Sequence, residues 1–279
     1  MSELPSFDPE PVRAEGGGHA ALALKIAAPI VVGILMLAGW QEIVRHYAIP
    51  PYILPGPLAI ARTLVSDWPT LSGSLWITLE NTGLAFLAAA IGGLAIAILF
   101  AQSRIVELSL FPYAVILQVT PIVAIAPLII IWVRDTQLAL LIRAWIVAFF
   151  PVVSNTTLGL NSADHNLLNL FQLYGASRSQ TLFLLRLPAA MPYFLGGLRI
   201  SGGLALIGAV VAEFVAGTAG SASGLAYRIL ESGYRLNIPR MFAALVLVSL
   251  AGVAIFLVLT LLQWLMLRRW HESAVRREN

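Results

Sequence analysis

The sequence contains no cysteine and only one lysine, Lys25, among its 279 residues. The absence of cysteine excludes disulfide bonds, thiolate chemistry and cysteine-ligated metals. Lys25 is not part of a GxxxxGK[ST] motif, so the chain cannot bind ATP through a P-loop of its own. The HExxH, GxSxG and EF-hand patterns are also missing, and the four histidines are scattered. No enzyme active site, metal site or cofactor is therefore expected.

Charged residues are scarce: they make up 11% of the chain, against 59% hydrophobic residues, and the mean hydropathy is +0.86. A soluble domain carries about 25% charged residues. This composition is typical of an integral membrane protein that folds as one helical bundle. The net charge of +3 fits basic loops at a membrane surface better than nucleic-acid binding, so the lipid bilayer is the expected partner and nucleic acid is not.

Six apolar runs are long enough, at about 20 residues each, to cross a bilayer. Because only helices and closed barrels satisfy every backbone group in lipid, and these runs are too long for barrel strands, all six are expected to be helices. The expected spans are residues 20–44, 77–101, 111–133, 138–160, 194–217 and 241–267. The expected domains are a disordered cytosolic tail (1–19), a transmembrane domain (20–271) and a cytosolic C-terminal tail (272–279).

Basic residues indicate how the chain is oriented. They are more numerous in the segments that lie on the same side as the two termini, and the stretch RRWHESAVRREN directly follows the last apolar run. Cytosolic loops carry the excess of arginine and lysine in membrane proteins. Both termini are therefore expected on the cytoplasmic side.

Among the charged residues in the expected spans, three stand out: Glu80, Arg143 and Glu213. A charge inside a bilayer costs at least ~2.5 kcal/mol, which makes each of them a functional candidate. One interpretation is a polar, water-accessible cavity that passes a solute. The other is structural: an ion pair of Arg143 with Glu213 or with Glu80, or snorkelling of Glu80 to the membrane interface. The residues leave both interpretations open.

The third span combines the polar Gln118 and Thr120 with three prolines, Pro112, Pro121 and Pro127. Each proline frees a backbone carbonyl and tends to kink a helix. Such breaks are tolerated in membranes where protein or a water-filled cavity satisfies the freed groups. The third helix is therefore expected to be kinked, either beside a pathway or for packing.

Residues 161–193 join the fourth and fifth spans on the cytosolic side and read as two short helices. Asp164 is a suitable N-cap for the first helix, and apolar residues then recur at helical spacing. Gly175 is a natural residue to follow the end of that helix. Ser177 can cap a second short helix, which Pro188 is expected to end. The pair is either an amphipathic hairpin at the membrane surface or a docking element for a partner.

Gly175 is followed after nine residues by Leu185-Arg186-Leu187-Pro188. This pattern resembles the Gly-x9-Ile-x-Leu-Pro core of the cytosolic coupling loop of ABC importer permeases. The runs YGASRSQTLFLLRLPAAMPYFLGGLRI, ALIGAVVAEFVAG and QVTPIVAIAPLIIIW are similar to permeases of the nitrate, sulfonate and taurine type, and more so to the group for thiamine pyrimidine precursors and riboflavin. The resemblance covers about residues 50–267. One departure is Asn169-Leu170-Phe171, where the family has Glu-Ala-Ala.

The resemblance implies an all-α membrane fold: the six-helix transmembrane domain of a type I ABC importer, with a cytosolic coupling helix pair between helices four and five. It implies a bacterial inner-membrane protein and three kinds of partner: a pair of ATPase subunits that bind the ATP, a second copy of the permease, and a periplasmic or lipoprotein substrate-binding protein. The implied coupling residues are Asp164, Gly175, Ala176, Ser177, Arg178, Leu187 and Pro188. The pathway candidates are Gln118, Thr120, Pro121, Arg143, Asn155 and Glu213.

The expected function is import of a small solute by alternating access. The substrate implied by the resemblance is a pyrimidine thiamine precursor or a riboflavin-like vitamin, with sulfonate, taurine or nitrate as the alternative. A secondary transporter that needs no ATPase is the rival from another class, and it would use the buried charges as an ion relay. Many secondary transporters show paired halves, and no internal repeat is visible in this sequence.

Overall fold

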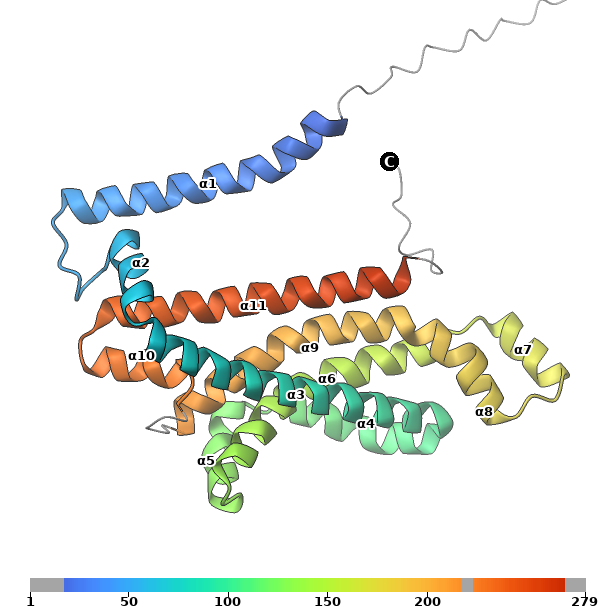
Figure 1. Cartoon of the computed structure of the whole chain (residues 1–279). Coiled ribbons are helices and arrows are strands. Elements are labelled where there is room, and N and C mark those ends of the chain that lie inside the picture. Colours follow the sequence, from blue (N-terminus) through green and yellow to red (C-terminus); the bar gives the residue numbers. More distant parts are fainter. Residues whose placement is uncertain (1–17, 217–222, 269–279) are drawn as a thin grey trace, which may run out of the picture. The chain divides into compact units, whose positions relative to one another are not determined.

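The computed structural model describes residues 18–216 and 223–268, and these residues form helices joined by short connections (Figure 1). No β-strand occurs in the described part of the chain, which confirms the all-α prediction. The predicted tails, 1–19 and 272–279, fall almost wholly outside the described residues. The elements are α1 (Gly18–His46), α2 (Pro57–Ser66), α3 (Trp68–Gln102), α4 (Arg104–Val119), α5 (Ile122–Trp132), α6 (Thr136–Leu160), α7 (His165–Leu173), α8 (Arg178–Thr181), the π-helix η1 (Leu182–Arg186), α9 (Leu187–Ala216), α10 (Leu225–Tyr234) and α11 (Ile238–Leu267).

The chain divides into two compact units, residues 1–58 and residues 59–279. The first unit contains α1, which begins and ends within two residues of the first predicted span. Its Ala27–His46 part has a mean hydropathy of 1.7, which suits a bilayer-crossing helix. Gln41 lies within α1, and its side-chain oxygen accepts a hydrogen bond of 3.2 Å from the Leu58 amide at the start of α2. This bond holds the connection between the two helices.

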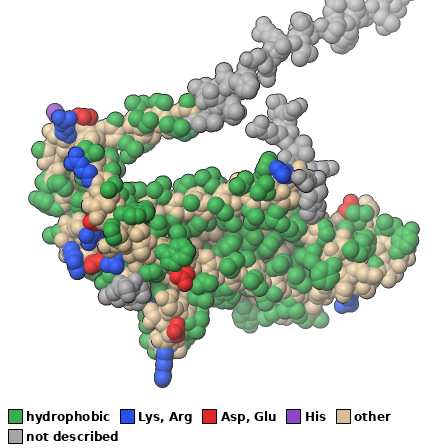
Figure 2. Space-filling view, in the orientation of Figure 1, with side chains coloured by type: hydrophobic (Ala, Val, Ile, Leu, Met, Phe, Trp, Pro, Cys, Tyr) green, Lys and Arg blue, Asp and Glu red, His purple; other side chains and the backbone are tan. Residues whose placement is uncertain are grey.

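The second unit is a bundle in which α6 packs against α3 and α9. Small residues allow the close approach: a Cβ on Gly93 would lie 2.7 Å from Val152 Cβ, and one on Gly208 would lie 2.8 Å from Ala144 Cα. Small residues at such contacts are typical of membrane helices. Apolar side chains cover the middle of the helices on the visible face, and charged side chains gather near helix ends (Figure 2).

The third predicted span is a broken helix. α4 and α5 meet at a bend of 102° at Thr120 and Pro121, so the prediction of one kinked helix over 111–133 was wrong in extent. Pro121 has no amide hydrogen and disfavours helical backbone at the residue before it, and Thr120 is extended, with ψ of 122°. Pro112 and Pro127 lie inside α4 and α5 without breaking them. In the described part of the chain, five helical segments are long and apolar enough to span a membrane, and the bent pair, counted as one span, makes six.

Two helix boundaries differ from the predictions. α3 begins at Trp68, nine residues before the expected start of the second span, with Pro69 in its first turn, where a missing amide hydrogen costs nothing. Pro188 does not end the second short helix, because α8 continues through η1 into α9. In η1 the Leu187 amide bonds to the Leu182 carbonyl, five residues back. This wider π-type turn precedes Pro188, which occupies the first turn of α9.

Candidate functional site

Five of the seven predicted coupling residues lie at the caps, in the turn or at the start of the second helix of the pair α7–α8: Asp164, Gly175, Ala176, Ser177 and Arg178. The other two, Leu187 and Pro188, begin α9. The caps of the pair are as the sequence indicated. The Asp164 carboxylate accepts a 2.7 Å hydrogen bond from the Asn166 amide at the start of α7. Ser177 and Gln180 form a capping box: the Ser177 hydroxyl accepts from the Gln180 amide at 3.2 Å, and the Gln180 side-chain oxygen accepts from the Ser177 amide at 2.7 Å. Each cap satisfies amides that a helix start leaves free.

The turn between the two helices requires glycine. Gly175 has a φ of +67°, a left-handed conformation that glycine adopts without a steric cost. The Gly175 amide bonds to the Gln172 carbonyl at 3.0 Å, and the Ala176 amide bonds to the Phe171 carbonyl at 2.9 Å. These two bonds form a Schellman motif, which satisfies the last carbonyls of α7. The turn sets the angle at which α8 leaves α7.

The helix pair presents apolar side chains to its surroundings. Leu173 and Tyr174 are 85% and 83% exposed, and Phe183 and Leu184 are exposed as well. They lie beside a groove of about 390 Å³ whose lining includes two coupling candidates. The groove is lined by Leu170, Phe171, Tyr174, Gly175, Ala176, Gln180 and Leu184. An exposed apolar groove with a polar rim is a feature of protein-binding surfaces.

A single arginine connects the helix pair to the long helix α3. The Arg186 guanidinium donates a 3.0 Å hydrogen bond to the Ala101 carbonyl in the last turn of α3. A cation is favoured at a helix C-terminus, where carbonyls lack partners. Arg178 and Arg186 also line a polar pocket of about 240 Å³ between the helix pair and α3. The segment that follows the pair is thus bonded to α3 and is continuous with α9.

Three of the six pathway candidates meet at the break between α4 and α5. Gln118, Thr120 and Pro121 line one cavity of about 330 Å³, together with Pro151 of α6 and Leu204 of α9. The Thr120 hydroxyl donates to the Ile116 carbonyl at 2.7 Å, one turn back in its own helix. The bend thus produces a cavity with polar groups beside α6. In a membrane, non-helical backbone is tolerated where protein or a water-filled cavity satisfies its polar groups.

Asn155, the fourth pathway candidate, lies one turn beyond Pro151 on α6. Its side-chain amide donates a 2.8 Å hydrogen bond to the Pro151 carbonyl. Asn155 does not line the cavity at the α4–α5 break. Asn155 therefore contacts the wall of that cavity, because it bonds to the carbonyl of the lining residue Pro151, but it does not lie in the cavity itself.

Arg143 is fully buried and does not form the ion pair that the sequence suggested. Its Nε atom donates to the Ala139 carbonyl at 2.8 Å, and its Nη1 atom donates to the Ala212 carbonyl of α9 at 3.1 Å. Neither Glu213 nor Glu80 pairs with it among the described residues. The ion-pair interpretation was wrong because Glu80 is exposed on α3 and the Glu213 carboxylate is bonded elsewhere.

The Glu213 carboxylate lies at the N-terminus of α10. Its Oε2 atom accepts from the Thr78 hydroxyl at 3.0 Å and from the Ala226 amide at 3.2 Å. The Thr78 hydroxyl in turn accepts from the Leu225 amide at 2.9 Å. A negative charge is stabilised at a helix N-terminus, where amides are free. Gly224 contacts the carboxylate so closely that a Cβ on it would collide. Glu213 and Thr78 therefore cap α10 from two other helices.

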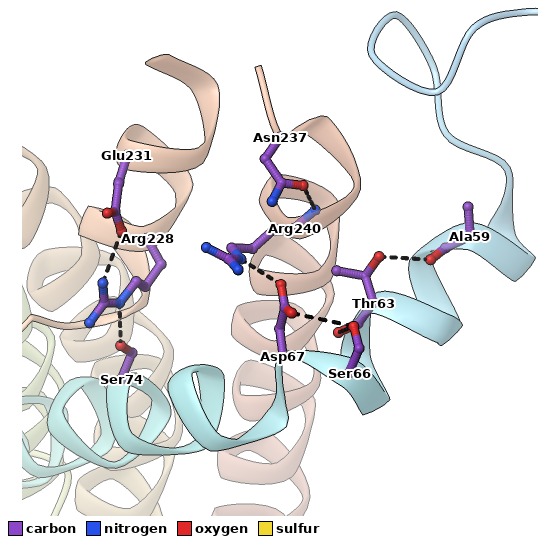
Figure 3. A network of polar contacts seen from close by, with 9 residues as sticks. All are labelled: Ala59, Thr63, Ser66, Asp67, Ser74, Arg228, Glu231, Asn237 and Arg240. Carbon is purple, nitrogen blue, oxygen red and sulfur yellow. Dashed lines mark hydrogen bonds and ion pairs between the residues drawn. The ribbon is translucent and has the colours of Figure 1, made fainter. Parts of the chain in front are cut away.

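A polar network joins the start of α3 to α10 and α11 (Figure 3). Asp67 forms an ion pair with Arg240, while Arg228 bonds to Ser74 at 3.0 Å and to Glu231 at 2.9 Å. Neither α10 nor this network was predicted. For the start of α11 a usable signal was present in Asn-Ile-Pro-Arg at 237–240, because asparagine caps a helix and proline suits its first turn. The Asn237 side chain does accept from the Arg240 amide.

The broken helix α4–α5, the exposed helix pair α7–α8 and the polar cavities fit a membrane-spanning transport protein. The chain belongs to the family of binding-protein-dependent transport system inner membrane components, whose model matches residues 89–271. It is 34% identical to the riboflavin transport system permease protein RibX of Chloroflexus aurantiacus over 249 residues, which is 86% of this chain and 88% of that one. It is also 34% identical to a probable ABC transporter permease of Haemophilus influenzae over 82% of this chain and 93% of that one.

Solved structures show the same fold. A crystal structure of an amino acid ABC transporter with histidines superimposes with a TM-score of 0.58 at 19% identity, over 72% of this chain and 96% of that one. The predicted family and fold are thereby confirmed. The chain is a multi-pass permease subunit of an ABC importer for small solutes, and family membership replaces the alternative of a secondary transporter. Further relatives are permeases for formylaminopyrimidine, aliphatic sulfonates, taurine and nitrate.

Proposed function

We propose that the chain imports a heteroaromatic vitamin or vitamin precursor, of the riboflavin or thiamine-pyrimidine class, into the cytoplasm. The observation that carries this proposal is the 34% identity to the riboflavin permease over 86% of the chain, supported by 29% identity to a formylaminopyrimidine permease of Halalkalibacterium halodurans. The apolar lining of the groove between α3, α9 and α11, which includes Phe86, is compatible with a flat ring system.

The proposed working unit is a permease homodimer, with two ATPase subunits on the cytoplasmic face and a substrate-binding protein on the other. Both termini lie on the cytoplasmic side in this proposal. ATP binding closes the ATPase pair, and the helix pair α7–α8 moves with it. The exposed Leu173 and Tyr174 and the groove beside them are suited to such a partner. The partner shifts the permease only as far as its contacts differ between the two states.

Arg186 and η1 transmit the movement in this proposal. Because α8, η1 and α9 form one continuous helical segment from Arg178 to Ala216, displacement of α8 acts directly on α9. The bond from Arg186 to the Ala101 carbonyl carries the same displacement to α3. Two helices that flank α6 are therefore driven together, which suits the switch from an inward-facing to an outward-facing pathway.

A second substrate class is favoured by one observation. Arg143 is a buried cation without a carboxylate partner among the described residues, and relatives include permeases for sulfonates, taurine and nitrate. An anionic solute would supply the missing charge. Import of a sulfonate, taurine or nitrate is therefore the alternative function.

The test is uptake by proteoliposomes that contain the permease, its ATPase and its binding protein. Radiolabelled riboflavin, formylaminopyrimidine, taurine and nitrate are supplied separately, each with ATP and with a non-hydrolysable ATP analogue. The proposal expects uptake of one of the first two solutes, with ATP only. Uptake of taurine or nitrate alone would establish the alternative, and equal uptake with the analogue would contradict coupling to an ATPase.

A further inference from the structure

Arg143 leaves part of its guanidinium without a hydrogen-bond partner among the residues that the structure describes. The side chain is 0% exposed, and its Nε and Nη1 atoms donate to the carbonyls of Ala139 and Ala212. Its Nη2 atom is buried and has no hydrogen-bond partner within residues 18–216 and 223–268. Nη2 carries two N–H groups, so two strong donors remain free for a ligand.

No carboxylate forms an ion pair with this guanidinium among the described residues. A buried ion costs several kcal/mol unless a counterion or good hydrogen bonds offset the loss of water. Glu213 follows Ala212 in the chain, but its carboxylate is bonded to Thr78 and to the Ala226 amide. Asp135 caps α6 by accepting a 2.6 Å hydrogen bond from the Leu138 amide, and it is exposed. Residues 217–222 contain no acid in sequence.

A cavity lies beside the Arg143 side chain. It has a volume of about 110 Å³, and it is bounded by the end of α5, the start of α6 and the end of α9. A water molecule takes about 30 Å³ in the liquid, so the cavity has room for a small polyatomic group. Its lining contains two arginines and one hydroxyl, and no acid. The lining residues are Ile130, Val133, Arg134, Thr136, Ala139, Arg143 and Ala216.

From this juxtaposition we propose that Arg143, together with Arg134, binds one small anion in the cavity between α5, α6 and the end of α9. The planar guanidinium of Arg143 offers the two Nη2 donors to a halide or to the oxygens of a nitrate, carboxylate or sulfonate. Arg134 is exposed at the mouth of the cavity and adds a second positive charge. The Thr136 hydroxyl is a third donor in the lining.

The anion has two sources with the same chemistry: a free ion such as chloride, or the charged group of the transported solute. The second source rests on the alternative substrate class proposed above, and the first does not depend on the substrate. In both cases the bound charge offsets the burial of Arg143, and it secures the contact between α6 and the end of α9 that the Ala212 carbonyl begins.

The experiment measures anion binding by the purified full-length permease in detergent. Sodium nitrate and sodium chloride are compared with sodium gluconate at equal ionic strength, by isothermal titration and by the thermal unfolding midpoint. Gluconate is too large for the cavity. The proposal expects saturable nitrate or chloride binding and a higher midpoint than in gluconate. Equal midpoints in all three salts, with no saturable heat, would overturn it and leave water as the partner of Nη2.

Arg134→Gln is the informative variant, because Arg134 is exposed and its loss does not threaten folding. It is expected to weaken anion binding about tenfold, the equivalent of about 1.4 kcal/mol. Arg104→Gln, at an arginine that is 71% exposed and remote in sequence from the cavity, is the matched control and keeps wild-type affinity. Nitrate affinity unchanged in Arg134→Gln and in a folded Arg143→Gln protein would contradict the site.

Competition between nitrate and a transported anion identifies the source of the bound anion. If taurine or another transported anion displaces nitrate, the cavity holds the charged group of the solute. If it does not, while nitrate still binds, the cavity holds a counterion. Because binding is read without transport, a failed uptake assay leaves this result intact, and a failed binding assay leaves the transporter function intact.

Discussion

The helix pair α7–α8 and the junction of α9 with α10 are both held by capping interactions, but over different distances in the sequence. In the helix pair, the caps connect residues at most five positions apart, such as Ser177 with Gln180. At the end of α9, Glu213 and Thr78 are separated by 135 residues, and Thr78 and Leu225 by 147. The first region takes its shape from local chemistry, and the second only after three helices have assembled.

This difference suits the two regions to different tasks. A locally capped helix pair keeps its shape while it moves against a partner, since none of its own caps depends on the rest of the bundle. The end of α9 is shaped by its neighbours α3, α6 and α10, so any change in their arrangement reaches Glu213 and Ala212. Variants in the two regions should therefore fail in different ways.

Glu213→Ala should have the largest effect. It leaves the Ala226 amide without an acceptor and the Thr78 hydroxyl without its bond in a buried site, and unsatisfied buried groups cost about 1–3 kcal/mol each. The free energy of unfolding should fall by about 3 kcal/mol, with lower yields of the folded permease. The thermal unfolding midpoint of purified protein measures this.

Glu80→Ala is the matched control for that variant, because Glu80 lies in the same kind of apolar helix but is exposed. Its midpoint should stay near that of the wild type. A Glu213→Ala protein as stable as the Glu80→Ala protein would show that the long-range cap carries no stability.

Gly175→Val should have the next largest effect, and this effect should be on uptake and not on stability. A side chain in the left-handed conformation costs about 1–2 kcal/mol, and a β-branched one fits there poorly. The cost is confined to the turn, so the midpoint of the whole permease should change little. Uptake should be abolished and co-purification of the ATPase should weaken, because α8 leaves α7 at another angle.

The control for this variant is Gly203→Ala, at a helical glycine where an added Cβ would meet no atom within 4 Å. Uptake should remain at the wild-type level there. Normal transport by Gly175→Val would contradict the assignment of α7–α8 as the coupling element.

The same contrast explains what could be predicted from the sequence. Asp164, Gly175 and Ser177 act on neighbours a few residues away, so their roles were readable from residue type and spacing. The long apolar runs were readable for a similar reason, since lipid demands helices of a given length. The partners of Arg143 and Glu213 were not, because a charge in an apolar helix does not indicate which distant group it meets.

Two errors arose from proline, whose effect depends on the backbone around it. Pro121 and Pro188 were both expected to disturb a helix. Pro121 produces a bend of 102°, whereas a π-type turn absorbs Pro188 within one continuous helical segment. α10 was missed because its amides are capped by Thr78 and Glu213, which lie in other helices.

Ser177→Ala should have a smaller effect than Gly175→Val. It removes the hydroxyl from the capping box and leaves the Gln180 amide without that bond, which costs about 1 kcal/mol. Because α8 continues into η1 and α9, the helix start should fray without unfolding the segment. Hydrogen exchange at the Gln180 amide should quicken, and uptake should fall only in part. Ser177→Asp, which keeps an acceptor at the cap, should restore protection of this amide; equal exchange in all three proteins would show that the cap is not formed.

Arg104→Ala should have the smallest effect, although Arg104 and Glu107 form a 2.8 Å ion pair within a single helical turn. Arg104 is 71% exposed, and exposed ion pairs contribute about 0.2–1 kcal/mol. The arginine also lies in the first turn of α4, where a positive charge opposes the helix dipole. The two effects offset each other, so the thermal midpoint should shift by less than that of Ser177→Ala and should not respond to salt. A salt-sensitive drop in the thermal midpoint that exceeds the drop in Ser177→Ala would contradict this prediction. It would mean that the exposed ion pair stabilises the chain as much as a helix cap does.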